Sequence, residues 1–566
     1  MTFPLLQAHP ALAGVAEEDL KFWRGDHMVA EREPLRPVSG AGRAIVVSGS
    51  AGGIDHAPLL ELPVGNGLAV VCQLKLVEKC RTEPAAGQIL ANLLGYLARW
   101  RPAPAKTTLV LGGSPAYLAC LRRLGLRLDE SADAAKVDLS ACGLVILRGS
   151  VAADNAQAAQ LGRRLREFVD LGGRVLVHRP EGDRAQSLLA AMGLDLTLQP
   201  GPATLAKAEG TDPILEAFTR EDLYWLARRA EWWTGQPSPR SSAMCDGSLG
   251  RKLDETRAEA HPVADWQLQG GLVERRADGV IFATVGTATG EVDFPADGVY
   301  TLGVVAGGTP CQGVFPAASV TIDDRPMGTV QLRGPQAQTY TVWGSVSRGR
   351  HRVAIAFIND ASIPGKEDRN LVVEKLLVAP DESAGVLALT NPAAAVAVRR
   401  GKGLIVVDRV RWDTDAVNAR KAARYACTLL GQLGGGLACR TGVTLPCDEM
   451  TPQKDMPFFE KRNGLACLAC NGYVAGPIRV AAGGRYTLEV FAGGSAVKDE
   501  YPAVEVAVDG RVIARIQTAS LDCRPYPVTA ELAPGEHELR LAFVNDLTAG
   551  GEDRNLFLEK VVCYKE

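Results

Sequence analysis

Two internal duplications constrain the fold of this chain more than any single motif does, because repeats define domains without an alignment. Residues 65–97 and 401–433 align without a gap, and each reads as a glycine turn followed by a buried strand and a helix. Shorter matching segments precede them at residues 9–23 and 212–225. In the first copy, apolar residues at helical spacing mark one face of the expected helix. The first duplication therefore predicts two related α/β units.

The spacing inside the two copies differs by the length of a domain. Leu20 and Gly67 are 47 positions apart, whereas their counterparts Leu223 and Gly403 are 180 positions apart. The second copy therefore carries an insertion of about 133 residues, which is the size of a small domain.

The second duplication accounts for this insertion. Residues 353–378 match residues 539–563 with a one-residue gap, and the segments upstream of both also match. These segments contain short strands of alternating apolar and polar residues, such as the one starting at Tyr486, separated by Gly, Pro and Asp turns. This pattern is typical of an antiparallel β-sandwich. One sandwich thus lies inside the second α/β unit, and the other is C-terminal.

The expected architecture is multidomain, with two flavodoxin-like α/β units and two antiparallel β-sandwich (jelly-roll) modules. Residues 106–200 alternate strands with helices, which predicts a parallel sheet for the second unit. The first unit has no such half, so we expect it to be incomplete at its N-terminus. The expected domains are 1–105 for the first unit, 106–261 with 381–437 for the second unit, 262–380 for the inserted sandwich and 438–566 for the C-terminal sandwich.

The composition excludes several classes of function. The net charge is −3 and the sequence pI is about 6.3, which argues against a nucleic-acid binder. No apolar run approaches the ~18 residues of a membrane span. The first residues do not read as a secretory signal. The 13 cysteines are scattered and odd in number, which suggests buried thiols in a reducing, cytoplasmic compartment. The localisation itself stays open.

The first duplication resembles the glutamine-amidotransferase-like domain found behind the barrel of β-galactosidase-type glycoside hydrolases. The resemblance covers residues 1–100 and, more weakly, 106–260 with 381–437. In such enzymes this domain is ancillary, and catalysis lies in a separate barrel. The residues that carry the resemblance are His9-Pro10, Glu18-Asp19-Leu20, Phe22-Trp23, Gly65, Gly67, Gln73-Leu74, Glu83-Pro84 and Leu93-Leu94.

The second duplication resembles the calcium-dependent, xylan-binding type of carbohydrate-binding module, and it does so twice with nearly equal spacing. The variable loops of the two copies differ, at Thr309-Pro310-Cys311-Gln312 and Lys498-Asp499-Glu500, so the sugar specificity is not given by the resemblance. The motif residues are Asn359-Asp360 with Glu367-Asp368-Arg369-Asn370-Leu371, and Asn545-Asp546 with Glu552-Asp553-Arg554-Asn555-Leu556.

These acidic pairs suit calcium, which takes about six to eight oxygen ligands from carboxylates, carbonyls and water. A loop that carries Asn-Asp and then an acidic cluster several residues later can curl around one ion. Vicinal sugar hydroxyls could complete its coordination. The expected metal residues are Asp360, Glu367, Asp368, Asn370, Asp546, Glu552, Asp553 and Asn555. Tyr340 and Tyr526, at comparable positions, are candidates for carbohydrate stacking.

Other interpretations of the same residues remain open. Asp368 and Asp553 could cap a turn, while Arg369 and Arg554 pair with a neighbouring carboxylate. A purely structural calcium without bound sugar is also possible. The Cys467-x-x-Cys470 pair could be half of a zinc site, but Cys439 and Cys447 are spaced too widely for a standard knuckle.

No catalytic constellation emerges from the sequence. The segment Gly112-Gly113-Ser114 partly matches a nucleophile elbow, and His178 could be its base. The better interpretation is that the glycines form the first turn of a parallel sheet and that Pro115 opens a helix. The catalytic residues therefore stay unknown.

The function expected from the sequence is calcium-dependent binding of a polysaccharide or oligosaccharide, as the accessory region of a glycoside hydrolase. An upstream catalytic domain or chain is then a possible partner. The alternative is that the chain is itself a glycoside hydrolase with an unrecognised carboxylate site. A scaffold that assembles partners through its α/β units is a third possibility.

Overall fold

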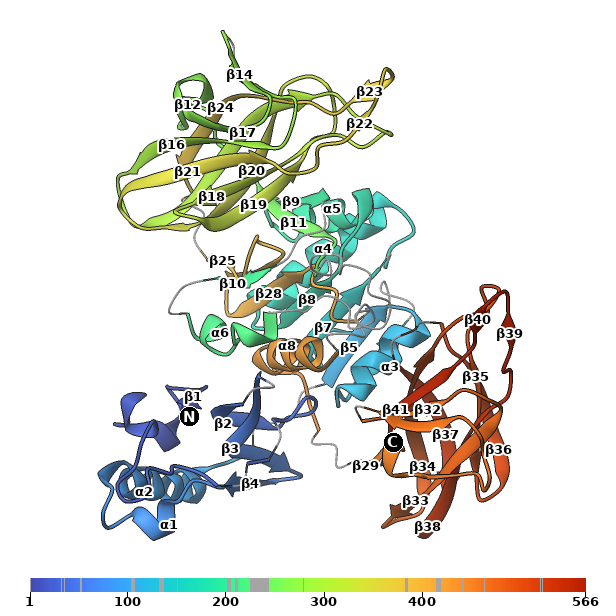
Figure 1. Ribbon diagram of the computed structural model, residues 1–566. Helices are drawn as coiled ribbons and strands as arrows, with labels where there is room; N and C mark the ends of the chain where they lie inside the picture. The colour runs from blue at the N-terminus through green and yellow to red at the C-terminus, as the bar shows by residue number, and fades with distance from the viewer. Residues whose placement is uncertain are drawn as a thin grey trace. The chain divides into compact units, whose positions relative to one another are not determined.

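The computed structural model divides into two compact units, which are described separately. The first contains the N-terminal sheet, the α/β sheet and the inserted sandwich, and the second contains the C-terminal sandwich (Figure 1). No helix among the described residues has the length and apolarity needed to span a bilayer. The structure describes residues 2–31, 33–34, 36–50, 53–102, 107–131, 137–149, 151–200, 205–208, 212–223, 244–277, 279–381, 385–413, 419–438, 442–462, 464–519, 521 and 523–565.

The N-terminal part is a four-stranded sheet in the order β1-β2-β3-β4, and all of its described pairings are antiparallel. Its longest helix, α2, packs on the sheet through one apolar cluster that includes Ile45, Leu59, Ile89 and Leu93. The elements are β1 (Thr2–Pro4), η1 (Pro10–Leu12), η2 (Glu18–Leu20), β2 (Arg43–Ser50), β3 (Gly53–Val64), β4 (Gly67–Cys72), α1 (Leu76–Lys79) and α2 (Pro84–Arg99).

This part differs from the α/β unit expected at residues 1–105. The predicted strand and helix are present as β4 and α2, but β4 is a half-exposed edge strand and is not buried. The reason is the connection. Gly65, with φ +57°, and Asn66 join β3 to β4 in a tight hairpin, and a two-residue connection permits only antiparallel pairing.

The second part is a seven-stranded sheet in the order β25-β27-β28-β8-β7-β5-β6. Strands β28, β8, β7, β5 and β6 run parallel to one another, whereas β27 pairs antiparallel with β28, so the predicted parallel sheet is present with an antiparallel margin. Strand β28 follows the inserted sandwich in the chain, yet it pairs with β8, which precedes the sandwich. The elements are β5 (Thr107–Gly112), α3 (Pro115–Arg123), β6 (Asp129–Ser131), β7 (Cys142–Arg148), α4 (Asn155–Asp170), β8 (Arg174–His178), α5 (Gly182–Ala191), α6 (Pro213–Glu216), η3 (Glu221–Leu223), β25 (Val386–Ala388), β27 (Ala395–Arg400), β28 (Gly403–Asp408) and α8 (Ala419–Gln432).

Two short antiparallel pairs flank this sheet. They are β9 (Leu196–Pro200) with β11 (Gly247–Arg251), and β10 (Ala206–Lys207) with β26 (Thr390–Asn391).

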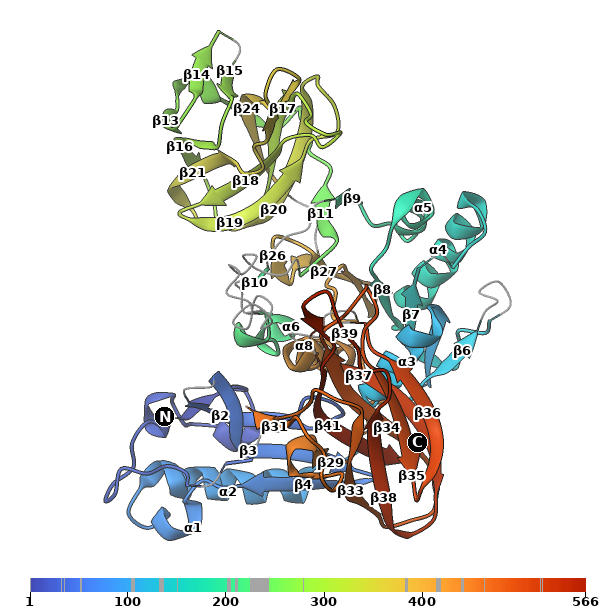
Figure 2. The same ribbon diagram turned by 45° about the vertical axis from the view of Figure 1, so that its right-hand side comes forward.

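The inserted module is a sandwich of two antiparallel sheets, as the alternating pattern predicts (Figure 2). One sheet has the order β14-β15-β24-β17-β20, with β12 also on β24, and the other has the order β13-β16-β21-β18-β19. The strands are β12 (Glu259–Pro262), β13 (Gln267–Gly270), β14 (Val273–Arg276), β15 (Gly279–Phe282), β16 (Gly286–Phe294), β17 (Gly298–Gly308), β18 (Ala317–Ile322), β19 (Arg325–Gln331), β20 (Gln338–Val346), β21 (Gly349–Phe357), β22 (Ser362–Ile363), β23 (Glu367–Asp368) and β24 (Leu371–Pro380), with η4 (Val263–Asp265).

The C-terminal module repeats this topology strand for strand. Its sheets have the orders β31-β32-β41-β34-β37, with β29 also on β41, and β30-β33-β38-β35-β36. The strands are β29 (Val443–Pro446), β30 (Thr451–Pro452), β31 (Phe459–Arg462), β32 (Leu465–Leu468), β33 (Gly472–Val480), β34 (Gly484–Gly494), β35 (Ala503–Val508), β36 (Arg511–Gln517), β37 (Arg524–Leu532), β38 (Gly535–Phe543), β39 (Thr548–Ala549), β40 (Glu552–Asp553) and β41 (Leu556–Lys565), with η5 (Cys447–Glu449).

Local irregularities also recur at matching positions. The β17–β24 ladder shifts register between Val305 and Ala306, and the β34–β41 ladder shifts between Phe491 and Ala492. A bulge that recurs at matching positions is a built feature of the fold. The two modules are therefore structural copies, and their loops can be compared position by position.

Candidate functional site

Each sandwich carries the predicted acidic residues on one loop, between β21 and β24 in the inserted module and between β38 and β41 in the C-terminal module. In each loop a two-residue ribbon folds the chain back on itself. Ser362 pairs with Asp368 in β22–β23, and Thr548 pairs with Asp553 in β39–β40. The fold-back returns the second acidic cluster toward the first, as the spacing of the motif predicts.

Several oxygens in these loops are buried and have no hydrogen-bond partner among the described residues. They are Oδ1 of Asp360, Oδ1 of Asn370 and Oδ1 of Asp546. Burial, together with the nearby charge of Asp553, raises the pKa of Asp546 above its usual value. Buried polar atoms in proteins nearly always have a partner. Unpartnered oxygens in two matching loops therefore fit a hard cation such as calcium.

A buried arginine holds each loop in shape. Arg369 donates to the backbone oxygens of Cys311 and Val314, at 2.7 Å each, and to that of Asn359. Arg554 donates to the backbone oxygens of Val497 (2.8 Å), Glu500 (3.0 Å) and Asn545. Among the described residues, the carboxylate contact of the alternative interpretation is found at Arg554, whose guanidinium lies 3.1 Å from Glu500. The arginines therefore act mainly as clamps on carbonyl groups.

Sequence reasoning missed the hydroxyl residues that position the second acidic cluster. Thr309 Oγ1 donates to the backbone oxygen of Asp368 (2.6 Å) and accepts from the amide of Asn370 (3.0 Å). Ser495 Oγ makes the same two bonds with Asp553 (2.6 Å) and Asn555 (2.8 Å). The available signal was a small hydroxyl residue that follows Ala-Gly-Gly in both copies.

The asparagines that open the two motifs form hydrogen bonds with backbone amides. Oδ1 of Asn359 accepts from the amide of Ala317, and Oδ1 of Asn545 accepts from the amide of Ala503, both at 2.6 Å. This leaves the adjacent aspartates as the residues that present an oxygen to the loop.

The remaining predicted metal residues lie in different settings. Glu367 is exposed, and its Oε2 accepts from the backbone amide of Gln312 at 2.6 Å. Nδ2 of Asn370 donates to Asp368 Oδ2 at 3.0 Å. In the C-terminal loop, Asp553 accepts from the Thr548 hydroxyl at 2.5 Å, and Glu552 is exposed. Glutamate carboxylates are thus placed at the rim of each loop.

The two tyrosines, Tyr340 and Tyr526, differ in how much of the ring surface is exposed. Tyr340, on β20, is 8% exposed and belongs to the core of the inserted sandwich, so its ring offers little surface for stacking. Tyr526, on β37, is half-buried, and burial raises its pKa. Each hydroxyl accepts a backbone amide, from Arg333 and Ala519 respectively. Their matched structural role explains why they occupy equivalent positions.

No group of three or more His, Cys, Asp or Glu side chains in the described part of the chain has the arrangement of a metal centre. A cation in the loops would therefore use amide, backbone and external oxygens beside the aspartates. The possible zinc cysteines give no such group either. Burial raises the pKa of Cys447 to about 12 and of Cys467 to about 11, and Cys439 lies outside the described residues.

The C-terminal end of the parallel sheet holds the residues considered for catalysis. Ser114 caps helix α3, where its hydroxyl accepts from the amide of Tyr117 at 3.2 Å. His178 is fully buried, stacks on Trp412 and bonds to the Tyr117 hydroxyl at 3.0 Å, and burial lowers its pKa to about 3. These contacts are those of a capped turn and a packed core, as the turn interpretation predicts.

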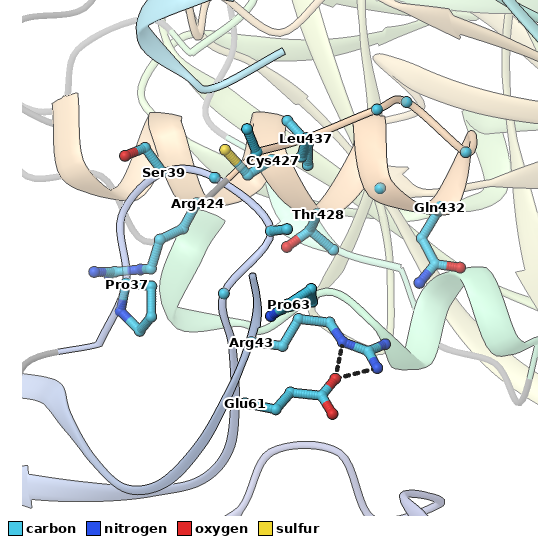
Figure 3. Close-up of a pocket in the computed structure, with 18 of the residues that line it drawn as sticks. Pro37, Ser39, Arg43, Glu61, Pro63, Arg424, Cys427, Thr428, Gln432 and Leu437 are labelled. Atoms are coloured by element: carbon cyan, nitrogen blue, oxygen red, sulfur yellow. Dashed lines mark hydrogen bonds and ion pairs between the residues drawn. The ribbon is translucent and has the colours of Figure 1, made fainter. Parts of the chain in front are cut away.

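A cavity of about 790 Å³ lies in the first unit, beside helix α8. Figure 3 shows Thr428 and Gln432 of this helix on one side of it and Arg43 with Glu61 on another. Arg43 forms a hydrogen bond with Glu61. Burial alone raises the pKa of Glu61, but its contacts with His9, Arg43 and Tyr96 outweigh this effect and hold the pKa at about 2. Arg43 and Glu61 thus bond to each other, and the residues that line the cavity include none from either acidic loop.

The comparison with protein families finds one match, which occurs twice. Residues 301–385 and 487–565 match the family described as calcium-dependent, xylan-binding carbohydrate-binding modules. The matched segments include both acidic loops, both arginine clamps and both hydroxyl residues that position the second cluster. No curated protein matches the chain.

Solved structures with similarity to the chain span one module each. A family 36 carbohydrate-binding module in complex with calcium and xylotriose shares 15% identity, over 21% of this chain and 97% of that chain, with a TM-score of 0.17. A family 35 module from Clostridium thermocellum shares 12% identity, over 22% of this chain and 99% of that chain, with a TM-score of 0.18. Calcium-dependent carbohydrate binding is thus the function that the family match assigns to the two sandwiches.

Proposed function

We propose that the chain is the polysaccharide-binding accessory region of a glycoside hydrolase, with one calcium and sugar site on each sandwich. The observation that carries the proposal is the pair of matching loops, in which Asp360 and Asp546 each bury a carboxylate oxygen that has no hydrogen-bond partner in the part of the chain that the structure describes. Xylan is the first candidate ligand, because the family matched by both segments is described as xylan-binding.

In this proposal, Asp360, Asp368 and Asn370 hold the ion in the inserted module, and Asp546, Asp553 and Asn555 hold it in the C-terminal module. Glu367 and Glu552 add rim oxygens or their backbone carbonyls. Bound calcium supplies open coordination positions that oxygen donors such as vicinal hydroxyls can fill. The arginine clamps and the Thr309 and Ser495 hydroxyls keep the aspartates in place, so less ordering accompanies binding.

We further propose that the N-terminal sheet and the parallel sheet are amidotransferase-like scaffolds that carry the modules. The support is the gap-free match of residues 65–97 with 401–433 and the matching hairpins that open the two copies. In this role the α/β parts position the sugar-binding loops and take no part in chemistry.

Isothermal titration of the whole chain with calcium, and then with xylotriose, tests the function. We expect two calcium ions per chain, sugar binding that a chelator abolishes, and one site lost in each of the variants Asp360→Asn and Asp546→Asn. The matched controls Asp293→Asn and Glu536→Gln remove carboxylates from exposed ion pairs on the same modules and should leave both sites intact.

Two results would contradict the proposal in different ways. If the chain bound calcium but none of the xylan, galactan and mannan fragments, the calcium ion would have a purely structural role. Sugar binding that is unchanged by chelator and by both aspartate variants would place recognition elsewhere on the chain.

A further inference from the structure

The two acidic loops have the same backbone surroundings but different side chains at the rim. Figure 1 shows their ribbons, β22–β23 and β39–β40, at one end of each sandwich. The neighbouring turn has the same shape in both modules, because an isolated bridge joins Cys311 to Val314 and Val497 to Glu500. The clamping arginine of each module binds the carbonyl group of the last residue of this turn. Val314 and Glu500 therefore occupy matching positions at the rim.

A second pair of matching rim positions stands just before β16 and β33. These strands begin at Gly286 and Gly472, which close matching ladders with β21 and β38. The preceding residues are Val285 and Asn471, and both are exposed. Oδ1 of Asn471 accepts from the amide of Asp546 at 2.9 Å, so this position borders the acidic loop. Val285 has no polar side-chain atom and cannot form the corresponding bond.

Apolar side chains gather at this end of the inserted sandwich. In the described part of the module, the large apolar residues that are exposed are Leu272, Val285, Val314 and Ile358, at 47–61%. The amide of Leu272 donates to the hydroxyl of Thr284, next to Val285, at 2.8 Å. Ile358 follows β21 and opens the acidic loop. Single exposed apolar residues are ordinary, but a gathering of them marks a contact site.

The C-terminal module keeps two of these apolar positions and replaces the other two by polar residues. Phe458 matches Leu272, because the carbonyl group of each accepts the amide of an alanine before the next strand of its sheet. Val544 follows β38 as Ile358 follows β21. The replaced positions are those of Asn471 and Glu500. The apolar contact is thus shared in part, and the difference between the modules is confined to two sites on the rim.

The two polar replacements offer hydrogen-bonding groups in fixed places. Oε1 of Glu500 accepts from Nδ2 of Asn545, and Oε2 accepts from Arg554, both at 3.1 Å. The Glu500 side chain is still 57% exposed, and each carboxylate oxygen can accept a second hydrogen bond. The exposed amide group of Asn471 has both a donor and an acceptor. The C-terminal rim is therefore prepared for a polar ligand group, and the inserted rim is not.

We propose that the two sites select different forms of one polysaccharide. The inserted site takes sugars that carry an apolar ester, such as an acetyl group, beside the sugar whose vicinal hydroxyls reach the acidic loop. The C-terminal site takes the same chain with free hydroxyls. This inference rests on the function proposed above and names the form of the ligand at each site.

The physical reason is the cost of leaving a polar group without a partner. A hydroxyl placed against Val285 and Val314 loses its water and gains no hydrogen bond, whereas an ester has no donor and offers a methyl group. At the C-terminal rim the balance is reversed. An ester there gives no proton to Glu500, and a site that is built to bond a hydroxyl discriminates strongly against an analogue without one.

Isothermal titration of single-site variants of the full chain tests the inference. Asp546→Asn leaves the inserted site and Asp360→Asn leaves the C-terminal site, and each is titrated in calcium with xylohexaose and with partially O-acetylated xylohexaose. The inserted site should bind the acetylated sugar about fourfold more tightly, the ratio expected for burying one methyl group. The C-terminal site should bind the unsubstituted sugar more tightly.

An exchange of rim residues assigns the preference to these positions. In the Asp546→Asn chain, Val285→Asn with Val314→Glu should remove the preference for the acetylated sugar. Calcium titration of this variant shows whether the ion site is still formed. The matched control is Ser345→Glu, which adds a carboxylate at an exposed position near the opposite end of β20 and should keep the preference.

The outcomes separate this inference from the function on which it rests. Equal ratios of affinity at the two sites would overturn the inference but leave calcium-dependent sugar binding in place. A preference that persists after the exchange, with calcium bound, would also overturn it. If neither single-site variant bound either sugar, the proposed function would fail as well.

Discussion

A histidine–aspartate pair recurs at the same turn of both sandwiches. Nδ1 of His351 lies 2.6 Å from Asp323, and Nδ1 of His537 lies 2.6 Å from Asp509. Both aspartates adopt a left-handed backbone, with φ +48° and +50°. The second oxygen of each aspartate accepts a backbone amide across the turn. At the scale of single residues, this pair fixes a strained turn on each module, and in the C-terminal module it makes stability depend on pH.

The C-terminal pair predicts the direction of that dependence. The hydrogen bond with Asp509 raises the pKa of His537, and the same bond lowers the pKa of Asp509. The contribution of His537 to the free energy of unfolding is complete below its unfolded pKa of about 6.5. It is lost as the pH rises through the raised pKa of the folded state. The aspartate contribution is present above its unfolded pKa of about 3.9 and is lost as the pH falls through its lowered folded value.

We therefore expect the pair to stabilise the C-terminal module most between about pH 4 and 6.5. In urea unfolding, the midpoint urea concentration of this module should fall as the pH rises from about 6 to about 8, which is the range in which histidine loses its proton. In His537→Gln the fall should be smaller. Equal pH profiles for the natural chain and the variant would show that the pair makes no contribution.

Residues also mark the limit of what the sequence could predict. Asp360 and Asp546 were identified because carboxylates in a repeated motif are visible as letters. The roles of Arg369 and Arg554 were not, because their main partners are backbone carbonyls, which every residue has. A clamp on carbonyl groups leaves no partner pattern in the sequence, so the sequence suggested a carboxylate partner for these arginines as one alternative interpretation.

At the scale of elements, the clamp on the C-terminal loop is the feature with the clearest energetic consequence. Arg554 is almost completely buried and serves three carbonyl groups and one carboxylate. Removing the guanidinium leaves buried carbonyls without donors, and an unsatisfied buried group costs about 1–3 kcal/mol. The loop and the strand end that carry Asp546 and Asp553 then lose their fixed spacing.

We expect Arg554→Met to lower the stability of the C-terminal module by about 3 kcal/mol and to weaken its calcium site. Denaturant unfolding and calcium titration measure the two effects. Arg479→Met is the matched control, because its exposed pair with Glu536 is worth only about 0–1 kcal/mol. Stability changes of equal size in the two variants would argue against the clamp.

Elements also show why one strand was predicted wrongly. Residues 68–71 and 404–407 have nearly the same apolar sequence, and both were expected to be buried. Only β28 is buried, because β8 lies beside it. The neighbour of a strand is set by distant parts of the chain, so local sequence predicts the strand but not its place in the sheet. The sandwich strands were predicted correctly because alternation needs only one covered face.

At the scale of the whole molecule, the inserted sandwich is bound to the α/β part within the first unit. Arg251 and Asp381 form a buried two-bond ion pair, at 2.7 and 3.0 Å, across the base of the insertion. The Trp343 indole of β20 donates to the backbone oxygen of Leu249 at 2.6 Å. These contacts join the last strand before the insertion, a strand within it and the residue that follows it.

We expect Arg251→Met to destabilise the first unit by about 3–5 kcal/mol, because the largely buried Asp381 carboxylate loses two hydrogen bonds and a neighbouring positive charge. Differential scanning calorimetry measures the loss, which should appear in the transition of the first unit only. Arg350→Met, which removes an exposed ion pair on the inserted sandwich, is the control and should change little. A loss confined to the transition of the C-terminal module would contradict this assignment.

The Arg251–Asp381 pair ties together the two places where the chain enters and leaves the inserted sandwich. A module attached by one terminus passes any pull from its ligand through a single peptide link. Here a force on a bound polymer is shared between two covalent connections that the ion pair holds next to each other, so the sandwich resists rotation relative to the α/β part. A pull on the sandwich therefore reaches the α/β part through β11 and through residue 381 together, and not through one strand alone.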